Sequence, residues 1–130
     1  MSIKRRKAKF LGALVVAATL SSTTALAATN YNYGPFTIDV ENQAYTSTKT
    51  KQTETAAYVD QSRCRNSVLV CRIYNSGVAP KSATVKLTGI DNGRMSYSGY
   101  GVDEGDVLRM MIKNTSASGG IVTVSGQWRP

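Results

Sequence analysis

Apolar and polar residues alternate along much of the chain after residue 35, which is the pattern of β-strands that bury one face. In GDVLRMMIKN, one set of alternate apolar side chains shares a face: Leu108, Met110 and Ile112. In IVTVSGQW, a second set does the same: Val122, Val124 and Trp128. The Ser/Gly-rich segment between the two predicts a turn, so we expect these strands to form a β-hairpin at the end of the chain.

Turn-forming residues divide the rest of the chain into further short strands. The predicted strands are residues 36–41, 53–59, 67–75, 82–88, 94–99, 106–114 and 120–128. The threonine-rich segment 46–55 is expected to be an exposed edge strand, protected by Lys49 and Lys51, that continues into Ala57 and Val59; a mobile loop is the alternative. Residues 28–35 are expected to be a loose lead-in, and residues 91–93, Asp-Asn-Gly, a turn.

Short strands without helical periodicity favour an all-β fold. We expect a single small antiparallel β-sandwich of about seven strands, an immunoglobulin-like Greek key, over residues 28–130. A small closed barrel is the alternative.

The two strands at the end of the chain carry a resemblance to known proteins. GDVLRMMIKN and GIVTVSGQW are similar to the closing strands of small secreted bacterial β-sandwich domains, in which a glycine and an acidic residue open a strand that ends in asparagine. Together with its N-terminal segment, the chain resembles small secreted β-sandwich proteins of Gram-positive bacteria, some of which sit beside bacteriocin export functions. This resemblance implies no functional residue.

The N-terminal segment has the three parts of a secretory signal peptide: basic MSIKRRKAK, apolar FLGALVVAATL and small-residue SSTTALA. The small residues predict cleavage between Ala27 and Ala28, so that residues 1–27 are removed. The apolar part has 11 residues, whereas a transmembrane helix needs about 20. We therefore expect no integral membrane anchor and a secreted, extracellular product.

The net charge of +8 comes mostly from this N-terminal segment. Residues 28–130 contain 11 basic and 8 acidic residues, which is a small and scattered excess. We therefore expect no nucleic-acid binding. A mild positive charge would still favour residence near an anionic cell surface.

Two cysteines occur in a chain that we expect to enter an oxidising compartment. Pairing is the ordinary outcome there, so the sequence predicts a disulfide between Cys64 and Cys71 on neighbouring strands. Two buried thiols in adjacent strands are the alternative.

The chain contains no histidine, which removes the Ser-His-Asp and Cys-His catalytic arrangements and the commonest zinc ligand. Asp39 and Glu41 share one face of the first predicted strand, but a solvated strand face is the simpler interpretation. Three carboxylates in GVDEGDV are expected to form a charged turn rather than a calcium site. We expect no enzymatic activity, no metal and no cofactor.

The remaining candidate chemistry is a set of tyrosines among serine and glycine in RMSYSGYG. Tyr97 and Tyr100, with Arg94 and Arg109 as neighbours, form a candidate binding surface, because tyrosine offers a large contact area at low entropic cost. Tyrosines that merely favour strands are the alternative.

These observations predict a secreted, non-enzymatic binding or interaction protein at the bacterial cell envelope. Its partner would be an unknown protein or a cell-wall ligand. A secreted antimicrobial (bacteriocin-like) protein or toxin is the second hypothesis, and an inhibitor or immunity-type protein is the third.

Overall fold

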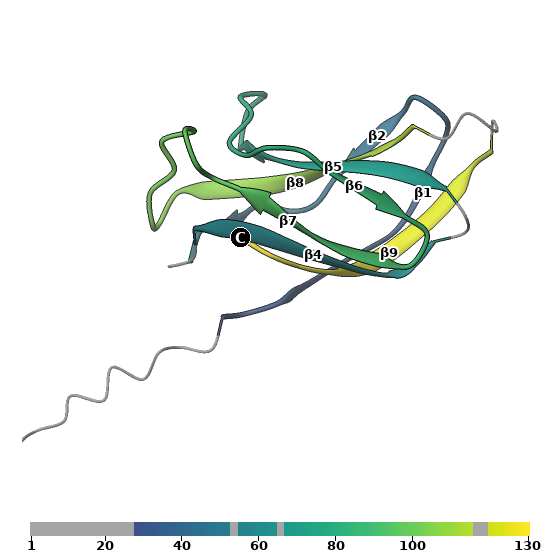
Figure 1. The fold of residues 1–130 in the computed structure, drawn as a ribbon, viewed down its shortest axis with the longest axis horizontal. Coiled ribbons are helices and arrows are strands. Elements are labelled where there is room, and N and C mark those ends of the chain that lie inside the picture. The colour runs from purple at the N-terminus through teal and green to yellow at the C-terminus, as the bar shows by residue number, and fades with distance from the viewer. Residues whose placement is uncertain (1–27, 53–54, 65–66, 116–119) are drawn as a thin grey trace, which may run out of the picture.

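The computed structural model describes residues 28–52, 55–64, 67–115 and 120–130. Over these ranges the regular secondary structure consists entirely of β-strands. The strands form two antiparallel sheets in two layers (Figure 1). The strands are β1 (Tyr31–Ile38), β2 (Gln43–Tyr45), β3 (Lys49–Thr50), β4 (Ala56–Arg63), β5 (Val68–Asn75), β6 (Val85–Thr88), β7 (Asp91–Ser96), β8 (Val107–Asn114) and β9 (Val122–Arg129). The predicted all-β class is confirmed. The predicted signal peptide, residues 1–27, lies outside the described residues.

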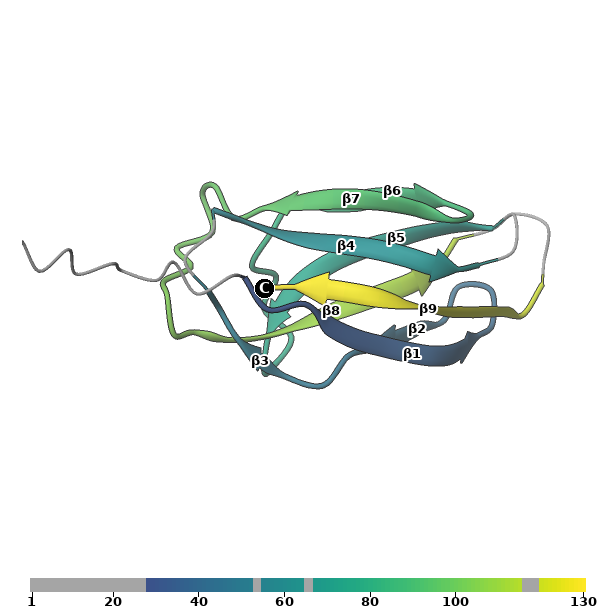
Figure 2. The same cartoon turned by 90° about the horizontal axis from the view of Figure 1, so that it is seen from below.

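The strands pair in a nested order along the chain. β1 pairs with β9, β2 and β3 with β8, β4 with β7, and β5 with β6. Two further pairings, β4 with β9 and β5 with β8, complete a four-stranded sheet β1-β9-β4-β7 and a five-stranded sheet that contains β2, β3, β8, β5 and β6. Figure 2 shows the four-stranded layer with its strands in this order. A long hairpin rolled into two sheets in this way is a jelly roll.

The predicted hairpin of the last two strands is wrong. β8 pairs with β5 and β2, β9 pairs with β1 and β4, and the two strands therefore belong to opposite sheets. In an immunoglobulin-like Greek key the last two strands share a sheet, so the strand order departs from that prediction as well. Alternation shows that each strand buries one face, but it does not say which sheet the strand joins. The predicted turn between them falls partly on residues 116–119, which lie outside the described residues.

The core lies between the two layers and contains the side chains that alternation assigned to it. Trp128, in the middle of the four-stranded sheet, is only 1% exposed. The two predicted inward rows are buried throughout: Leu108, Met110, Ile112, Val122, Val124 and Trp128. Both sheets therefore contribute a row of apolar side chains to one shared core cluster.

β1 replaces the loose lead-in that was predicted for residues 28–35. It begins at Tyr31 and pairs with β9 along its length, with an irregularity between Tyr33 and Phe36. Gly34 takes a φ of 75° at this irregularity, and a Cβ there would collide with the Val124 carbonyl oxygen. Glycine is required because this backbone conformation and this close approach both exclude a side chain.

The threonine-rich segment is an edge only in part. β2 and β3 both pair with β8 and form an interrupted edge strand of the five-stranded sheet. The chain then crosses to the other sheet, where β4 begins at Ala56. The predicted edge is confirmed at Lys49 and Thr50, whereas its continuation into Ala57 and Val59 is wrong. Residues 53–54 of the predicted strand lie outside the described residues.

The predicted turn at residues 91–93 is displaced. Those residues belong to β7, and the turn between β6 and β7 consists of Gly89, at a φ of 64°, and Ile90. The Asp91 carboxylate accepts a hydrogen bond from the Thr88 backbone N–H at 3.2 Å, which supports the turn from its side. The prediction therefore placed the start of this turn two residues too far along the chain.

Asn114, at the end of β8, is a buried link between the two sheets. Its side-chain amide donates to the Ile38 carbonyl of β1 and to the Gly120 carbonyl just before β9, both at 3.0 Å. Its backbone N–H donates to the Asn42 carbonyl, and its carbonyl accepts from the Glu41 N–H. A single fully buried residue thus satisfies backbone groups of both layers.

Trp128→Ala should lower the free energy of unfolding by about 3 to 5 kcal/mol, because it leaves a large cavity in the core. Urea unfolding followed by far-ultraviolet circular dichroism measures the change. Gln127→Ala, at the exposed neighbouring position, is the control and should leave stability nearly unchanged. A loss for Trp128→Ala no larger than that of the control would contradict the central position of this side chain.

Asn114→Leu should cost about 1 to 3 kcal/mol, because buried carbonyl groups lose their donor. Asn92→Leu makes the same substitution at an exposed position of β7 and should change stability by less than about 0.5 kcal/mol. The same unfolding experiment compares the two. Equal effects would show that Asn114 does not link the sheets.

Candidate functional site

The structure does not bring the four predicted binding residues together. Arg94 is exposed on β7 in the four-stranded sheet, and Arg109 lies on β8 in the five-stranded sheet. Tyr97 directly follows β7, and Tyr100 lies in the loop after it. The two arginines therefore belong to opposite layers of the sandwich, and they cannot contact one ligand as the sequence analysis expected.

Tyr97 is part of the core rather than of a binding loop. Its side chain is only 5% exposed, and its ring centroid lies 5.4 Å from the Lys51 ammonium nitrogen. It continues the inward alternation of β7 after the buried Met95. Tyr100 is half-buried and accepts a hydrogen bond from Arg72 at 3.2 Å, which ties it to the five-stranded sheet. Burial therefore leaves little of the Tyr97 ring for contact with a ligand.

Polar side chains gather instead on the outer face of the four-stranded sheet. In one row, Tyr58 of β4 is paired with Arg94 of β7 on one side and with Arg129 of β9 on the other. The Arg129 guanidinium carbon lies 4.7 Å from the centroid of the Tyr58 ring. Asn30, just before β1, borders the same hollow of the surface.

A second row crosses all four strands directly beside the first. Asp60 of β4 is paired with Asn92 of β7 and with Gln127 of β9, and Gln127 is paired with Asn32 of β1. The Gln127 side-chain amide donates to the Asn32 side-chain oxygen at 3.1 Å. We call the two rows together the polar face: Asn30, Asn32, Tyr58, Asp60, Asn92, Arg94, Gln127 and Arg129.

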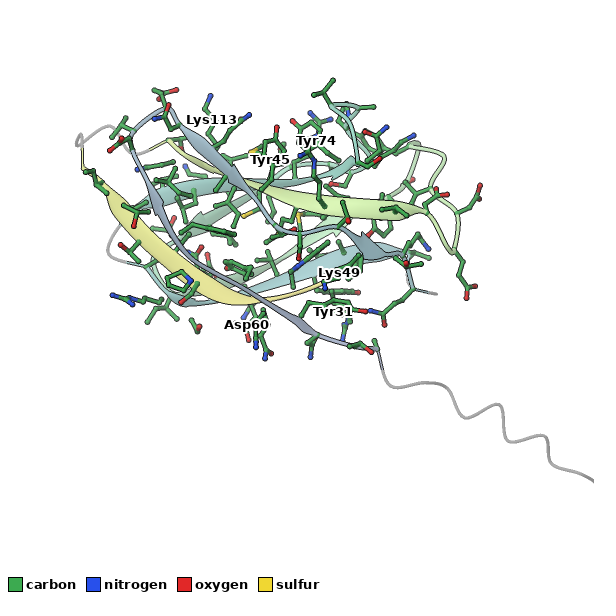
Figure 3. All side chains as sticks on the ribbon, turned by 180° about the vertical axis from the view of Figure 1, so that it is seen from behind. Tyr31, Tyr45, Lys49, Asp60, Tyr74 and Lys113 are labelled. Carbon is green, nitrogen blue, oxygen red and sulfur yellow. The ribbon has the colours of Figure 1, made fainter. Side chains whose placement is uncertain are left out.

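Seven of the eight residues of the polar face, all except Asn32, line a shallow hollow of about 420 Å³. Val59, Gly93 and Trp128 also line it, and because their neighbours point outward, these residues contribute mainly backbone to its floor. The Asp60 carboxylate and the Arg94 guanidinium make no ion pair or hydrogen bond with the described residues, so both are available to a ligand. Figure 3 shows Asp60 projecting away from the five-stranded layer.

The residue types of the second row are unusual for strands. Asparagine and aspartate are depleted in β-strands, yet Asn32, Asp60 and Asn92 belong to three different strands and lie in one row. Sequence reasoning missed this row because it assigned residues 28–35 to a lead-in and residues 91–93 to a turn. The alternation of polar residues within YVDQ and QWR was visible, but the register that aligns them was not.

The other acidic residues form no candidate site. Asp39 and Glu41 follow β1 in a turn, where Glu41 has a φ of 64° and forms an ion pair with Lys113 at 3.4 Å. In GVDEGDV, the Asp106 carboxylate accepts a hydrogen bond from the Asp103 N–H at 2.9 Å. Within the described ranges, no group of three or more Asp, Glu, Cys or His side chains is arranged to hold a metal ion.

The predicted disulfide is absent, and Cys64 and Cys71 are not bonded to each other. Cys71 is fully buried on β5, whereas Cys64 follows β4 in the other sheet and packs against the core. The prediction placed them on neighbouring strands, but β4 and β5 belong to opposite layers. Burial, with a smaller contribution from nearby Cys64, raises the pKa of the Cys71 thiol to about 12. Burial also raises the pKa of Cys64.

Comparisons with protein-family models, with curated proteins and with solved structures find no match to this chain. The polar face must therefore be interpreted from its own chemistry.

The part of the chain that the structure describes contains no helix long and apolar enough to cross a membrane.

The raised pKa values predict that both thiols react slowly with iodoacetamide near pH 8, because the thiolate is the reactive form. Intact mass should show little alkylation of the folded protein and two alkyl groups after unfolding without a reductant. Cys71 should be the slower of the two, and Cys64→Ser isolates it. Two cysteines that resist alkylation after unfolding until a reductant is added would show a disulfide instead.

Proposed function

We propose that the chain is a secreted, noncatalytic binding protein of the bacterial cell envelope, and that its polar face binds a cell-wall glycan. The observation that carries this proposal is the pair of polar rows around one hollow. Secretion is proposed from the three-part pattern of residues 1–27.

The hydrogen-bonding groups of the polar face suit the hydroxyl groups of a sugar. Each hydroxyl can both donate and accept, so it pairs with either kind of protein group. The amides of Asn30, Asn32, Asn92 and Gln127 offer donors and acceptors, Asp60 only accepts, and Arg94 only donates. Two guanidinium groups and one carboxylate leave the face with little net charge, which favours a neutral or weakly charged ligand over a polyanion.

Tyr58 supplies an apolar contact within this polar surrounding. It is 36% exposed, and the guanidinium of Arg129 lies beside its ring. A ring held in this way offers contact area with little loss of conformational freedom, which is how aromatic residues act in binding surfaces. The C–H groups of a sugar ring can pack on the exposed part of Tyr58 while its hydroxyl groups reach the neighbouring amides.

The extent of the polar face favours a chain of sugars over a single one. Neighbouring strands lie about 4.8 Å apart, so the rows extend about 14 Å from β7 to β1. Such a surface can contact several successive sugar units. This supports an oligosaccharide segment of the cell wall as the ligand.

The noncatalytic part of the proposal also has support in this face. Glycoside hydrolysis ordinarily uses two carboxyl groups that flank the scissile bond. Asp60 is the single carboxylate among the eight residues of the polar face. An open hollow with one carboxylate suits recognition better than hydrolysis.

The double substitution Asp60→Ala with Gln127→Ala should weaken binding of the mature protein to purified cell-wall glycan by about 5- to 150-fold, because two hydrogen bonds are lost and each is worth about 0.5 to 1.5 kcal/mol. Co-sedimentation with the insoluble glycan measures this. Thr123→Ala, on the same strand as Gln127 but outside the polar face, should bind as the wild type does. Near-ultraviolet circular dichroism checks that all variants are folded.

High salt should leave this binding largely intact, since hydrogen bonds rather than net charge carry it. Wild-type affinity in the double variant would refute the assignment of the polar face. Growth inhibition of related bacteria by the purified protein would instead favour the antimicrobial hypothesis. Capture of a secreted protein by the same face, without glycan binding, would favour an inhibitor.

A further inference from the structure

The outer face of the five-stranded sheet has a different chemistry from the polar face. Its outward positions carry cations and two tyrosines, which we call the basic face: Tyr45, Arg72, Tyr74, Lys86, Arg109 and Lys113. Figure 3 shows Tyr45, Tyr74 and Lys113 on one side of the molecule and Asp60 on the other. The two faces can therefore act independently.

The strand register spreads the four cations along the sheet. Lys86 of β6 and Lys113 of β8 flank Val70 of β5 in one row. Arg72 lies in the next row and Arg109 in the row after that, opposite Tyr74. Successive rows on one face are about 6.6 Å apart. The cations therefore form an extended band rather than a single cluster.

Little negative charge offsets this band. Lys113 forms an ion pair with Glu41, and the side chains of the two are 37% and 69% exposed. Arg72, Lys86 and Arg109 form no ion pair with the described residues. An ion pair as exposed as that of Lys113 contributes little and exchanges readily with a stronger anionic partner.

The two arginines are held in place by their neighbours. The Arg109 guanidinium carbon lies 3.9 Å from the Tyr45 ring centroid, and Nη2 donates to the Gly77 carbonyl. Arg72 donates through Nε to the Ser82 carbonyl at 2.8 Å and through Nη2 to the Tyr100 hydroxyl. Each guanidinium has five N–H donors, so donors remain for a ligand. Fixing these long side chains beforehand reduces the entropic cost of binding.

We propose that the basic face binds an anionic polymer whose phosphate groups repeat along an extended chain. Charge complementarity supports this ligand, because a band of spaced cations matches a chain of spaced anions better than it matches a single anion. Arginine also binds phosphate through two donors at once. This inference is independent of glycan binding, which uses the opposite face.

The environment of the tyrosines favours a phosphate chain without bases. Tyr45 and Tyr74 contact each other edge to face, with their ring centroids 6.0 Å apart, and Arg109 covers the Tyr45 ring. Proteins that bind single-stranded nucleic acid stack bases on exposed rings. Here Arg109 covers one face of the Tyr45 ring and Tyr74 packs edge-on against the same ring, so little aromatic face is left for base stacking.

The test measures binding of inorganic polyphosphate to the mature protein by titration calorimetry over a range of salt concentrations. For Lys86→Gln with Lys113→Gln we expect at least a tenfold loss of affinity at low salt. The slope of log affinity against log salt should become shallower by about 0.7 for each cation removed, the value for single-stranded polyanions. Arg63→Gln, at the exposed end of β4 in the other sheet, is the charge-changing control. This control removes one charge, and it should change the slope by less than half the change expected for the double variant.

Three outcomes would overturn the proposal. The first is an affinity loss in the double variant no greater than that of Arg63→Gln. The second is tenfold tighter binding of single-stranded DNA of equal charge, which would show base contacts. The third is binding to anionic lipid vesicles without binding to polyphosphate, which is tested because Val78 and Val107 are exposed near one end of this face.

The polyphosphate titration and the glycan co-sedimentation assay together distinguish this proposal from the proposed function. Asp60→Ala with Gln127→Ala should keep wild-type affinity for polyphosphate, and Lys86→Gln with Lys113→Gln should keep wild-type affinity for glycan at high salt. Loss of both activities in one variant with native circular dichroism would contradict the independence of the faces.

Discussion

The burial of two apolar rows in one core is the constraint on which the rest of the structure depends. The inward side chains of β8 and β9 belong to opposite sheets and to the same core cluster. Once these rows are inside, the alternate residues of both strands lie on the outer faces, where most of them are at least partly exposed and Met111 of β8 is buried. The inward packing therefore fixes the composition of the two outer faces. Asn114 joins the layers at one end by bonding to backbone groups on both sides.

The two outer faces differ in the balance of their positive and negative groups. On the four-stranded sheet, one carboxylate and two guanidinium groups lie among amides, so direction-dependent hydrogen bonds dominate. On the five-stranded sheet, four cations face one partner carboxylate, so long-range attraction dominates and salt weakens it. Under the two proposals above, the basic face would attract an anionic envelope and the polar face would select a sugar chain.

Aromatic residues lie both in the core and on the two outer faces. Trp128 fills the interior, whereas Tyr58 and Tyr45 each lie outside with an arginine over the ring. Such pairs are worth about 0.5 to 1 kcal/mol when exposed. Their larger effect is to restrict long side chains that would otherwise sample many rotamers. The tyrosine content noted in the sequence thus supports surface cations more than it forms a contact loop.

The sequence alone determined the all-β class, the inward row of each of the last two strands and the core position of Trp128, because a period of two is a local property of the chain. Only the tertiary structure decided which strands pair. It separated β8 from β9, placed Cys71 on β5 and Cys64 just after β4 of the other sheet, turned Tyr97 inward and assigned Arg94 and Arg109 to opposite faces. It also aligned Asn32, Asp60 and Asn92 in one row. Strand register depends on contacts between residues far apart in the chain, and alternation within one strand carries no information about them.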